Sequence, residues 1–260
     1  MSLEIDPDWW KNLFDEVYLV TDARSVCNDE ITSSEIDVFC KILPLSPQSK
    51  ILDLCGGQGR HAIELCRRGF LNCTVLDYSH TLLKTGSDKA KKDKFPIRFV
   101  YGDARRTDLV SGEYDIVLIL GNSLGYIGDE DGDLAILRES LRLLKPDGWL
   151  LLDITDGKAV RERLKPLSWH EIGDDVVVCR QREINNDAVC CREIVLSKAR
   201  GLIREQTYRI YLFERESLTA LVDKAGFREV KIHSLDHSTA CKEDDLGCMN
   251  HRLILTAKKL

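Results

Sequence analysis

Short apolar runs alternate with amphipathic segments through the middle of the chain. The apolar runs occupy residues 50–54, 73–77, 97–101, 115–120 and 149–154. They lack a regular polar alternation, which is typical of strands in a sheet that is covered on both faces. Between them, apolar residues recur at helical spacing over 60–68, 80–92 and 131–145. Alternating strands and helices predict a parallel sheet with right-handed crossovers, and Pro146-Asp147-Gly148 is expected to turn the last of these helices into its strand.

The first 45 residues show only helical patterns. Apolar residues from Trp9 to Tyr18 predict one amphipathic helix. A second helix is expected to start at Ser33 or Ser34, which are N-cap candidates, and to stop near Pro44. The two tryptophans at positions 9 and 10 either dock in the core or form an aromatic lid over a ligand.

Alternating strand formers dominate the chain after residue 156. A short helix over 157–164 is followed by alternation over 168–213, with turn signals at Asn185-Asn186-Asp187 and Arg200-Gly201. This pattern predicts an antiparallel meander of three or four strands. A helix over 214–225 and strands over 228–234 and 250–258 are expected to complete the fold.

A glycine cluster follows the first predicted strand and leads into a helix. Residues 57–62, Gly57-Gln58-Gly59-Arg60-His61-Ala62, fit the nucleotide-binding pattern G-x-G-x-x-[GA]. Glycines let the backbone approach a ligand closely, and the start of a helix offers unpaired N–H groups. This pattern alone does not tell a dinucleotide from other nucleotide ligands.

Three acidic residues narrow the choice of ligand. Asp53 ends the first predicted strand, Asp77 ends the second and Asp103 follows the third. Ligands of an open α/β sheet bind at the carboxyl ends of its strands, where these residues are expected. Asp77 is placed to accept ribose hydroxyls of either NAD or S-adenosylmethionine. Asp53 favours the latter, because it would repel a pyrophosphate and attract a cationic aminoacyl sulfonium.

Several stretches within residues 49–156 resemble the motifs of class I S-adenosylmethionine-dependent methyltransferases. They are Asp53-Leu54-Cys55-Gly56-Gly57-Gln58-Gly59, Leu76-Asp77-Tyr78-Ser79, Gly102-Asp103-Ala104, Tyr114-Asp115-Ile116-Val117 with Gly121-Asn122-Ser123-Leu124-Gly125-Tyr126, and the turn from Leu144 to Leu150. One departure is Cys55, which stands where many members have glycine. The resemblance implies an α/β fold with a Rossmann-like doubly wound seven-stranded sheet of order 3-2-1-4-5-7-6, the last strand antiparallel. It also implies S-adenosyl-L-methionine as the cofactor.

The resemblance further implies a set of cofactor contacts. Gly56, Gly57 and Gly59 are expected to approach the methionine part of the cofactor beside Asp53. Asp77 is expected to hold the ribose, with Tyr78 and Leu82 on the adenine and Gly102, Asp103 and Ala104 along its edge. Leu120, Gly121 and Asn122 are expected beside the sulfonium, and the candidates for the carboxylate are Tyr18, Arg24 and Arg60.

The chain is expected to divide into four parts. These are an N-terminal helical cap (1–48), the cofactor-binding half of the Rossmann-like domain (49–156), an inserted antiparallel β lid (157–213) and a C-terminal completion of the domain (214–260). The fifth strand ends at the cofactor edge, so the inserted lid is expected to cover the active site. The arrangement resembles small-molecule methyltransferases, some of which dimerise through the inserted sheet.

The implied reaction moves a methyl group to N or O of a small-molecule acceptor, mainly by positioning and in-line displacement. Tyr126, His170 and His237 are candidate bases, and each has a structural role as its alternative. The arginines of the predicted meander are expected on its solvent face, paired with Glu183, Glu193 and Glu205, or else on an acidic substrate; they are Arg180, Arg182, Arg192, Arg204 and Arg209.

Composition excludes several classes of partner. The formal net charge of −6 disfavours nucleic acid, as does Asn122-Ser123-Leu124, which lacks both prolines of the Asn-Pro-Pro-aromatic motif of base-methylating enzymes. The chain has 10 cysteines but no C-x-x-C pair, which predicts reduced thiols and no metal site. Because no signal peptide or long apolar run is visible, we expect a cytoplasmic protein without membrane contact. Two alternatives stay open, a protein or peptide methyltransferase on the same fold and an NAD-binding oxidoreductase.

Overall fold

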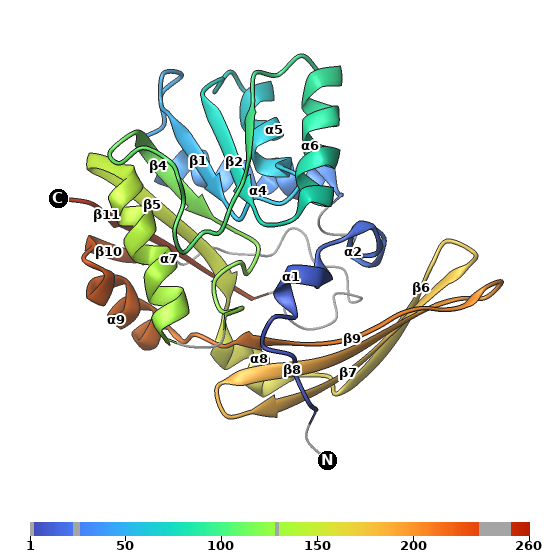
Figure 1. Ribbon diagram of the computed structural model, residues 1–260. Helices are drawn as coiled ribbons and strands as arrows, with labels where there is room; N and C mark the ends of the chain where they lie inside the picture. The colour runs from blue at the N-terminus through green and yellow to red at the C-terminus, as the bar shows by residue number, and fades with distance from the viewer. Residues whose placement is uncertain (1–2, 23–26, 128–129, 234–250) are drawn as a thin grey trace.

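The largest element of the computed structural model, which describes residues 3–22, 27–127, 130–233 and 251–260, is a mixed seven-stranded sheet (Figure 1). Its strands are β1 (Ile51–Leu54), β2 (Cys73–Asp77), β3 (Arg98–Tyr101), β4 (Tyr114–Ile119), β5 (Leu144–Thr155), β10 (Arg228–His233) and β11 (Arg252–Lys258). They lie in the order β10-β11-β5-β4-β1-β2-β3, and β11 runs antiparallel to both of its neighbours. Counted along this sheet, the order is 3-2-1-4-5-7-6 with the last strand antiparallel, so the predicted fold class is confirmed.

Helices cover both faces of this sheet, as its apolar strands require. One face carries α4 (Asp29–Ile42), α5 (Arg60–Arg67) and α6 (His80–Lys92), and the other carries α7 (Glu130–Leu143) and α9 (Arg215–Ala225). Neighbouring residues of β1 show the division, since Ile51 packs with α4 and α5 while Leu52 packs with α7 and α9. None of the helices in the described ranges is long and apolar enough to cross a membrane.

A second sheet is an antiparallel meander of four strands. It consists of β6 (Leu167–Ile172), β7 (Val176–Asn185), β8 (Ala188–Ser197) and β9 (Gly201–Tyr211), and it follows the short helix α8 (Gly157–Arg163). Gly157 N donates to Phe213 O at 2.9 Å, and Tyr211 N donates to Gly125 O at 2.9 Å. The meander therefore leaves and rejoins the fold beside the carboxyl ends of β4 and β5, with α1 and α2 between the two sheets (Figure 1). The predicted meander is confirmed.

The expectation of one helix from Trp9 to Tyr18 was wrong. The segment forms two short helices, α1 (Trp10–Leu13) and α2 (Glu16–Thr21). Asp15 separates them, because its backbone is extended and its side chain accepts from Tyr18 N at 3.0 Å as the N-cap of α2.

Two other boundaries differ from the sequence pattern. Helix α4 is capped by Asn28, whose Oδ1 accepts from Ile31 N at 3.0 Å, so Ser33 and Ser34 lie inside the helix. Pro146-Asp147-Gly148 lies within β5 as an irregularity, with Asp147 at φ 64°, and does not separate a helix from a later strand.

Helix α6 packs closely on the loop between β1 and α5, and Gly86 makes this approach possible. A Cβ added to Gly86 would lie 2.2 Å from Gln58 O and 2.7 Å from Phe99 Cε1. Any larger residue must therefore push the helix away from the loop.

We predict that Gly86→Ala lowers the free energy of unfolding by about 2 kcal/mol, because overpacking outweighs the gain in helix propensity. Urea denaturation measures the change. Thr85→Ala, at the exposed neighbouring position, is the control and should stay within about 0.5 kcal/mol of the parent. A more stable Gly86→Ala variant would contradict the close packing described here.

Candidate functional site

The loop between β1 and α5, residues 55–59, turns through left-handed backbone and is called the glycine turn below. Cys55, Gly57 and Gly59 have φ values of 61°, 56° and 69°. A Cβ on Gly56 would lie 2.6 Å from Asp53 Cγ, and one on Gly59 would lie 3.0 Å from Phe99 Cε1. Gly56 therefore requires glycine for space, and Gly59 combines a tight contact with a left-handed backbone that favours glycine. Cys55 adopts the left-handed conformation despite its Cβ, at a cost of about 1–2 kcal/mol.

Asp77 fastens the glycine turn to the end of β2. Its Oδ2 accepts from Gly57 N at 2.8 Å, and its Oδ1 accepts from Ser79 N at 2.8 Å. Burial raises the pKa of Asp77, and the N–H donors of Ser79 and Gly57 oppose that rise. Each carboxylate oxygen retains a second acceptor position. Asp77 can therefore hold the turn and still accept two hydroxyl groups from a ligand.

Asp53 is a buried carboxylate with neither oxygen hydrogen-bonded to any described residue. Its exposed fraction is 1%. Burial raises its pKa to about 6, although His61 and Arg60 pull in the other direction. Buried polar atoms are nearly always paired, so this one needs an explanation. A positively charged ligand group beside the glycine turn would supply the missing partner.

Arg60 and His61 turn toward α4. Arg60 Nη1 donates to Thr32 Oγ1 at 2.9 Å and forms an ion pair with Glu35, and His61 Nε2 lies 3.0 Å from Glu35 Oε2. Burial alone would raise the pKa of Glu35, but His61 and Arg60 outweigh it and lower the pKa. The structure thus places Arg60, a candidate for a ligand carboxylate, in a contact with the helical cap.

Aromatic side chains gather beside the ends of β2 and β3. The Tyr78 ring lies 4.9 Å from Trp10 and 5.2 Å from Tyr101, measured between centroids. Leu82, at 2% exposed, is buried under the start of α6. Trp10 therefore belongs to this edge, whereas Trp9 is 2% exposed and docks in the core. The core alternative is confirmed for Trp9, and a lid role for Trp10 stays a prediction.

Arg105 holds Asp103, a contact that the sequence analysis missed. Its Nη2 lies 2.6 Å from Asp103 Oδ2 and its Nε lies 3.0 Å from Oδ1. Gly102 N donates to Asp77 O at 3.0 Å, and Ala104 is buried. The signal for this turn was present, because an Asp side chain commonly accepts from the backbone N–H two residues on, as Asp103 Oδ1 does from Arg105 N at 2.9 Å.

Asn122 is tied to the neighbouring strands. Its Oδ1 accepts from Thr155 N at 2.7 Å and from Arg252 Nη1 at 2.9 Å, and Arg252 Nε pairs with Asp153 Oδ1 at 2.7 Å. These contacts fix the loop after β4, in which Leu120 is buried and Gly121 has φ 65°. Arg252 was also missed, and its only signal was a charge at the start of an apolar strand.

Tyr126 belongs to an aromatic cluster between the two sheets, formed by Trp9, Phe14, Tyr18, Tyr126 and Tyr208. Tyr126 stacks on Phe14 at 5.6 Å between centroids, and Trp9 lies 5.3 Å from Tyr126 and 5.6 Å from Tyr208. Burial raises the pKa of Tyr126, as it does for Tyr18 and Tyr208. These phenols therefore stay protonated at neutral pH, and their hydroxyl groups can donate hydrogen bonds.

The remaining candidates are spread over the chain. His170 lies on β6 opposite Val178, so strand alternation puts it on the same face of the meander as Arg180 and Glu193. Arg24 and His237 lie outside the described residues. No group of three or more His, Cys, Asp or Glu side chains that could hold a metal occurs in the described part of the chain.

The expectation that the meander arginines form a solvent face was wrong for most of them. Arg180 and Arg204 pair with Glu193, which is 2% exposed, and Arg182 is itself buried. Arg192 and Glu205 do form an exposed pair, at 2.6 Å. Polar residues alternate on both faces of these strands, so the pattern did not show which face would be covered.

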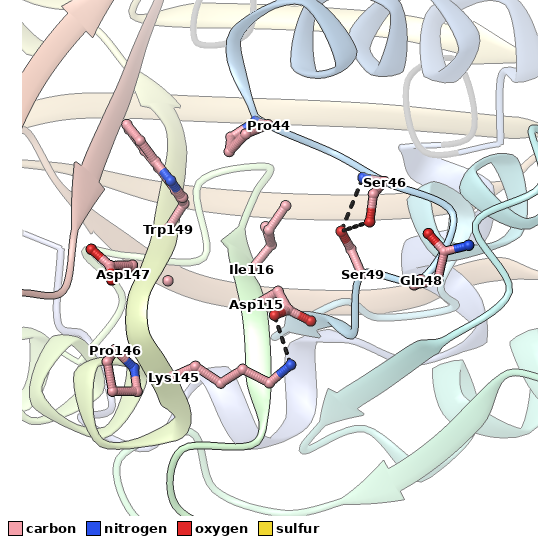
Figure 2. Close-up of a pocket in the computed structure, with 11 residues that line it drawn as sticks. Pro44, Ser46, Gln48, Ser49, Asp115, Ile116, Lys145, Pro146, Asp147 and Trp149 are labelled. Carbon is pink, nitrogen blue, oxygen red and sulfur yellow. Dashed lines mark hydrogen bonds and ion pairs between the residues drawn. The ribbon is translucent and has the colours of Figure 1, made fainter.

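A pocket of about 420 Å³ lies at the opposite edge of the seven-stranded sheet, before β1 and β4 (Figure 2). Asp115 and Lys145 in its wall pair with each other at 2.7 Å. Ligands of such sheets bind at the carboxyl ends of the strands, so this pocket lies at the wrong edge. The candidate site is the glycine turn with Asp53, Asp77 and the loop after β4.

Comparisons with known proteins place the central segment in a family. Residues 51–148 match the model of the methyltransferase domain family. The chain is 27% identical over 154 residues to a putative methyltransferase, YqeM, of Bacillus subtilis, covering 58% of this chain and 62% of that protein. It is 30% identical over 149 residues to a glycine/sarcosine N-methyltransferase of Aphanothece halophytica, covering 57% and 56%. The chain thus spans about three-fifths of the length of the curated relatives it matches.

Solved structures agree on the fold over nearly the whole chain. The CcbJ methyltransferase of Streptomyces caelestis superposes with a TM-score of 0.73 at 17% identity, covering 98% of this chain and 99% of that one. CalS10, an amino pentose methyltransferase of Micromonospora echinaspora, gives 0.68 at 17% identity, covering 96% and 99%. At this identity the likeness shows the fold.

Asp53 generates a prediction about pH. Its pKa rises from an ordinary 3.8 to about 6, so the folded protein keeps a proton that the unfolded chain has lost between these values. Its contribution to stability is complete below the lower value and is lost as the pH rises through the upper one. We predict that the stability of ligand-free Asp53→Asn relative to the parent rises by about 3 kcal/mol between pH 4 and pH 8.

Urea denaturation across this pH range measures that difference. Asp88→Asn is the control, because Asp88 is a surface carboxylate whose pKa is lowered by Lys84. Its relative stability should not rise with pH. A difference for Asp53→Asn that is independent of pH would show that Asp53 is not a strained buried acid.

Proposed function

Residues 51–148 of this chain belong to the methyltransferase domain family, and from that premise we propose that the protein moves a methyl group from S-adenosyl-L-methionine to a small-molecule acceptor. The chain has the class I methyltransferase fold, with a meander added at the cofactor edge. The acceptor atom is N or O, and N is favoured for the reason given below.

The buried, unpartnered carboxylate of Asp53 is the observation that carries this proposal. S-adenosyl-L-methionine carries an ammonium and a sulfonium at its aminoacyl end, and both are cations. A dinucleotide would instead bring a dianionic pyrophosphate to the glycine turn, next to two acids, the buried Asp53 and the half-buried Asp77. Repulsion between like charges is strong where water is excluded. The site therefore fits the sulfonium compound better than NAD.

The other proposed contacts follow from the places of the side chains. Gly56 and Gly57 leave room for the methionine part, and Asp77 accepts the ribose hydroxyls. Tyr78 and Leu82 would lie on the adenine, whose edge would meet Asp103 and Ala104; Asp103 would share its carboxylate with Arg105. Tyr18, Arg24 and Arg60 remain proposals for binding the carboxylate of the cofactor. Arg60 would have to give up part of its contact with Glu35 to bind it.

The cofactor supplies an electrophilic methyl group, and the residues of this chain orient the acceptor and exclude water from it. Tyr126 keeps its proton, because burial raises its pKa, so it suits orienting an acceptor by a hydrogen bond. A neutral amine needs no base, whereas a hydroxyl is a weaker nucleophile. This contrast favours N, as do the glycine/sarcosine N-methyltransferases among the relatives. His170 and His237 stay candidates for an acceptor that must lose a proton.

We also propose a homodimer through the outer face of the meander. Leu167, Trp169 and Leu202 share this face by strand register and are 73%, 68% and 59% exposed. Leu167 and Trp169 lie on the edge strand β6 and Leu202 on the opposite edge strand β9. Exposed apolar side chains of this size are typical of an interface. A second copy offers the same exposed residues, so the contact can be self-complementary.

We predict that Asp77→Ala binds S-adenosyl-L-homocysteine at least about 100-fold more weakly than the parent, because two hydroxyl contacts and the hold on Gly57 are lost. Calorimetry measures the affinity. Asp88→Ala, an exposed acid in the following helix, should bind like the parent. Equal affinity in both variants, or tighter binding of NADH than of the homocysteine compound by the parent, would remove the assignment.

Labelled cofactor incubated with metabolite pools identifies the acceptor, and the atom that carries the label decides between N and O. Labelling of peptides only, with no labelled metabolite, would favour the protein or peptide methyltransferase instead.

Light scattering tests the dimer. We predict that the parent chain has twice the monomer mass and that Trp169→Glu has the monomer mass, because a charge in the apolar face prevents its burial. Val110→Glu is the control, since Val110 is also 68% exposed but lies in the loop between β3 and β4. A parent chain that runs as a monomer would contradict this interface.

A further inference from the structure

Three buried ionic side chains form a row on the inner face of the meander. Glu193 of β8 lies between Arg180 of β7 and Arg204 of β9, with N···O distances of 2.7 Å to each. The exposed fractions of the two arginine side chains are 11% and 10%. Burial by itself would raise the pKa of Glu193, but Arg180 and Arg204 lower it, so the carboxylate stays ionised.

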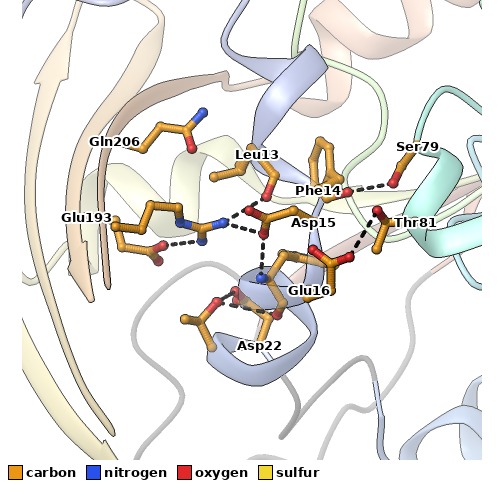
Figure 3. Close-up of polar contacts among 12 residues, drawn as sticks. Leu13, Phe14, Asp15, Glu16, Asp22, Ser79, Thr81, Glu193 and Gln206 are labelled. Atoms are coloured by element: carbon orange, nitrogen blue, oxygen red, sulfur yellow. Dashed lines mark hydrogen bonds and ion pairs between the residues drawn. The ribbon is translucent and has the colours of Figure 1, made fainter. Parts of the chain in front are cut away.

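Each arginine also reaches one end of helix α2. Arg204 Nη1 lies 2.6 Å from Asp15 Oδ1 and donates to Leu13 O at 3.0 Å. Arg180 Nη2 lies 3.1 Å from Asp22 Oδ2. Asp15 is the N-cap of α2 and Asp22 is its C-cap residue. Arg180 and Arg204 on the meander therefore contact opposite ends of the same helix. Figure 3 shows Glu193, Asp15 and Asp22 around α2.

The other side of this helical segment contacts the start of α6. Ser79 Oγ donates to Phe14 O at 2.5 Å, and Thr81 Oγ1 lies 3.4 Å from Glu16 Oε1 (Figure 3). Ser79 is also the residue whose N–H binds Asp77 Oδ1. Contacts thus run without a break from Glu193 through Arg204 and residues 13–15, which lead into α2, to Ser79 and the carboxylate that fastens the glycine turn.

Stability alone does not account for this arrangement. Helix α2 has six residues, too few to persist in water without tertiary contacts. A buried ion triad is commonly no more stable than apolar residues of the same volume, although losing one member leaves the others unpaired. A network of this kind instead fixes one geometry, and here the geometry is that of α2 against both sheets.

We propose that Glu193 is a positioning residue that holds α2 between the meander and Asp77, and thereby links cofactor binding to the ordering of the meander over the acceptor. This inference rests on the proposed function, because it takes S-adenosyl-L-methionine as the ligand of the Asp77 edge. Glu193 touches neither reactant. It acts through Arg180 and Arg204 on the two ends of α2.

The test compares Glu193→Gln with Glu205→Gln in the full chain. Both residues pair with arginines across β8 and β9, but the Arg192–Glu205 pair is exposed, with side-chain fractions of 40% and 44%. Calorimetry gives the affinity for S-adenosyl-L-homocysteine, and hydrogen exchange gives the protection of α2 and of β7 to β9 with and without it. We expect Glu193→Gln to bind about tenfold more weakly, because the competent arrangement of α2 is less populated.

Hydrogen exchange distinguishes positioning from simple support. In the parent, binding should slow exchange in α2 and in β7 to β9, although those strands lie outside the glycine turn. In Glu193→Gln the slowing should be confined to the seven-stranded sheet. A residue that merely supported the meander would lower protection there equally with and without ligand.

Asp15→Asn provides a second variant in case Glu193→Gln folds poorly. Asparagine caps a helix as well as aspartate does, so only the charge held by Arg204 is lost. It should shift affinity and exchange in the same direction. Parent-like affinity and parent-like exchange in a folded variant of either kind would overturn the inference and leave the proposed function standing. Failure of the parent to bind the homocysteine compound would overturn both.

Discussion

The hydrogen bond from Gly57 N to Asp77 Oδ2 is the contact on which the arrangement of the site depends. It joins the loop after β1 to the end of β2. The Asp77 carboxylate thereby lies against the backbone of the glycine turn, between β1 and α5. The same carboxylate accepts from Ser79 N, which starts α6. One half-buried acid thus fixes the relative positions of the first two strand–helix units.

The charged side chains around that contact differ in whether they are paired. Asp53 is buried and Asp77 is half-buried at the carboxyl ends of neighbouring strands, and burial raises the pKa of each. Nearby cations point elsewhere, since Arg60 and His61 are committed to Glu35, and Arg252 to Asp153 and Asn122. The basic residues beside the site are therefore paired with other acids, whereas the Asp53 carboxylate has no hydrogen-bond partner among the described residues. This separation of paired from unpaired charge favours a cationic ligand at the glycine turn.

The sequence was sufficient for the framework. Apolar runs without alternation identified β1 to β5, because a strand covered on both faces has most of its side chains in a core. The last two strands of the main sheet, β10 and β11, were expected as the completion of the fold. The glycine turn and Asp77 were also visible, since local geometry demands those residue types at that spacing. What could not be read were contacts between distant segments, such as Arg252 with Asn122 and Arg204 with Asp15, because ion pairs between separate elements leave no periodic signal.

The meander shows the same limit in another form. Its strands alternate charged and apolar residues on both faces, so the covered face is decided only when the N-terminal segment packs against it. Trp9 and Gln206 meet there, with the Gln206 amide donating to Trp9 O at 3.2 Å. The break between α1 and α2 has the same origin, because Asp15 serves as a cap and as a partner of Arg204 at once. Helical periodicity alone could not predict that Asp15 would both cap α2 and pair with Arg204.

The two adjacent tryptophans give the molecule an optical property of its own. Trp9 is sealed among Phe14, Tyr126 and Tyr208, whereas Trp10 stays partly open to solvent beside Tyr78 and Arg105. The two consecutive indoles therefore have different environments. Trp9 is surrounded by aromatic rings, and Trp10 is partly exposed to solvent next to a guanidinium group. We expect the emission of Trp10 to change when a ligand binds beside Tyr78. We expect the emission of Trp9 to change when the meander separates from the N-terminal helices. Trp149 and Trp169 also emit, so ultraviolet fluorescence of a chain in which both are replaced by phenylalanine reads the state of both sides of the N-terminal segment without an added label.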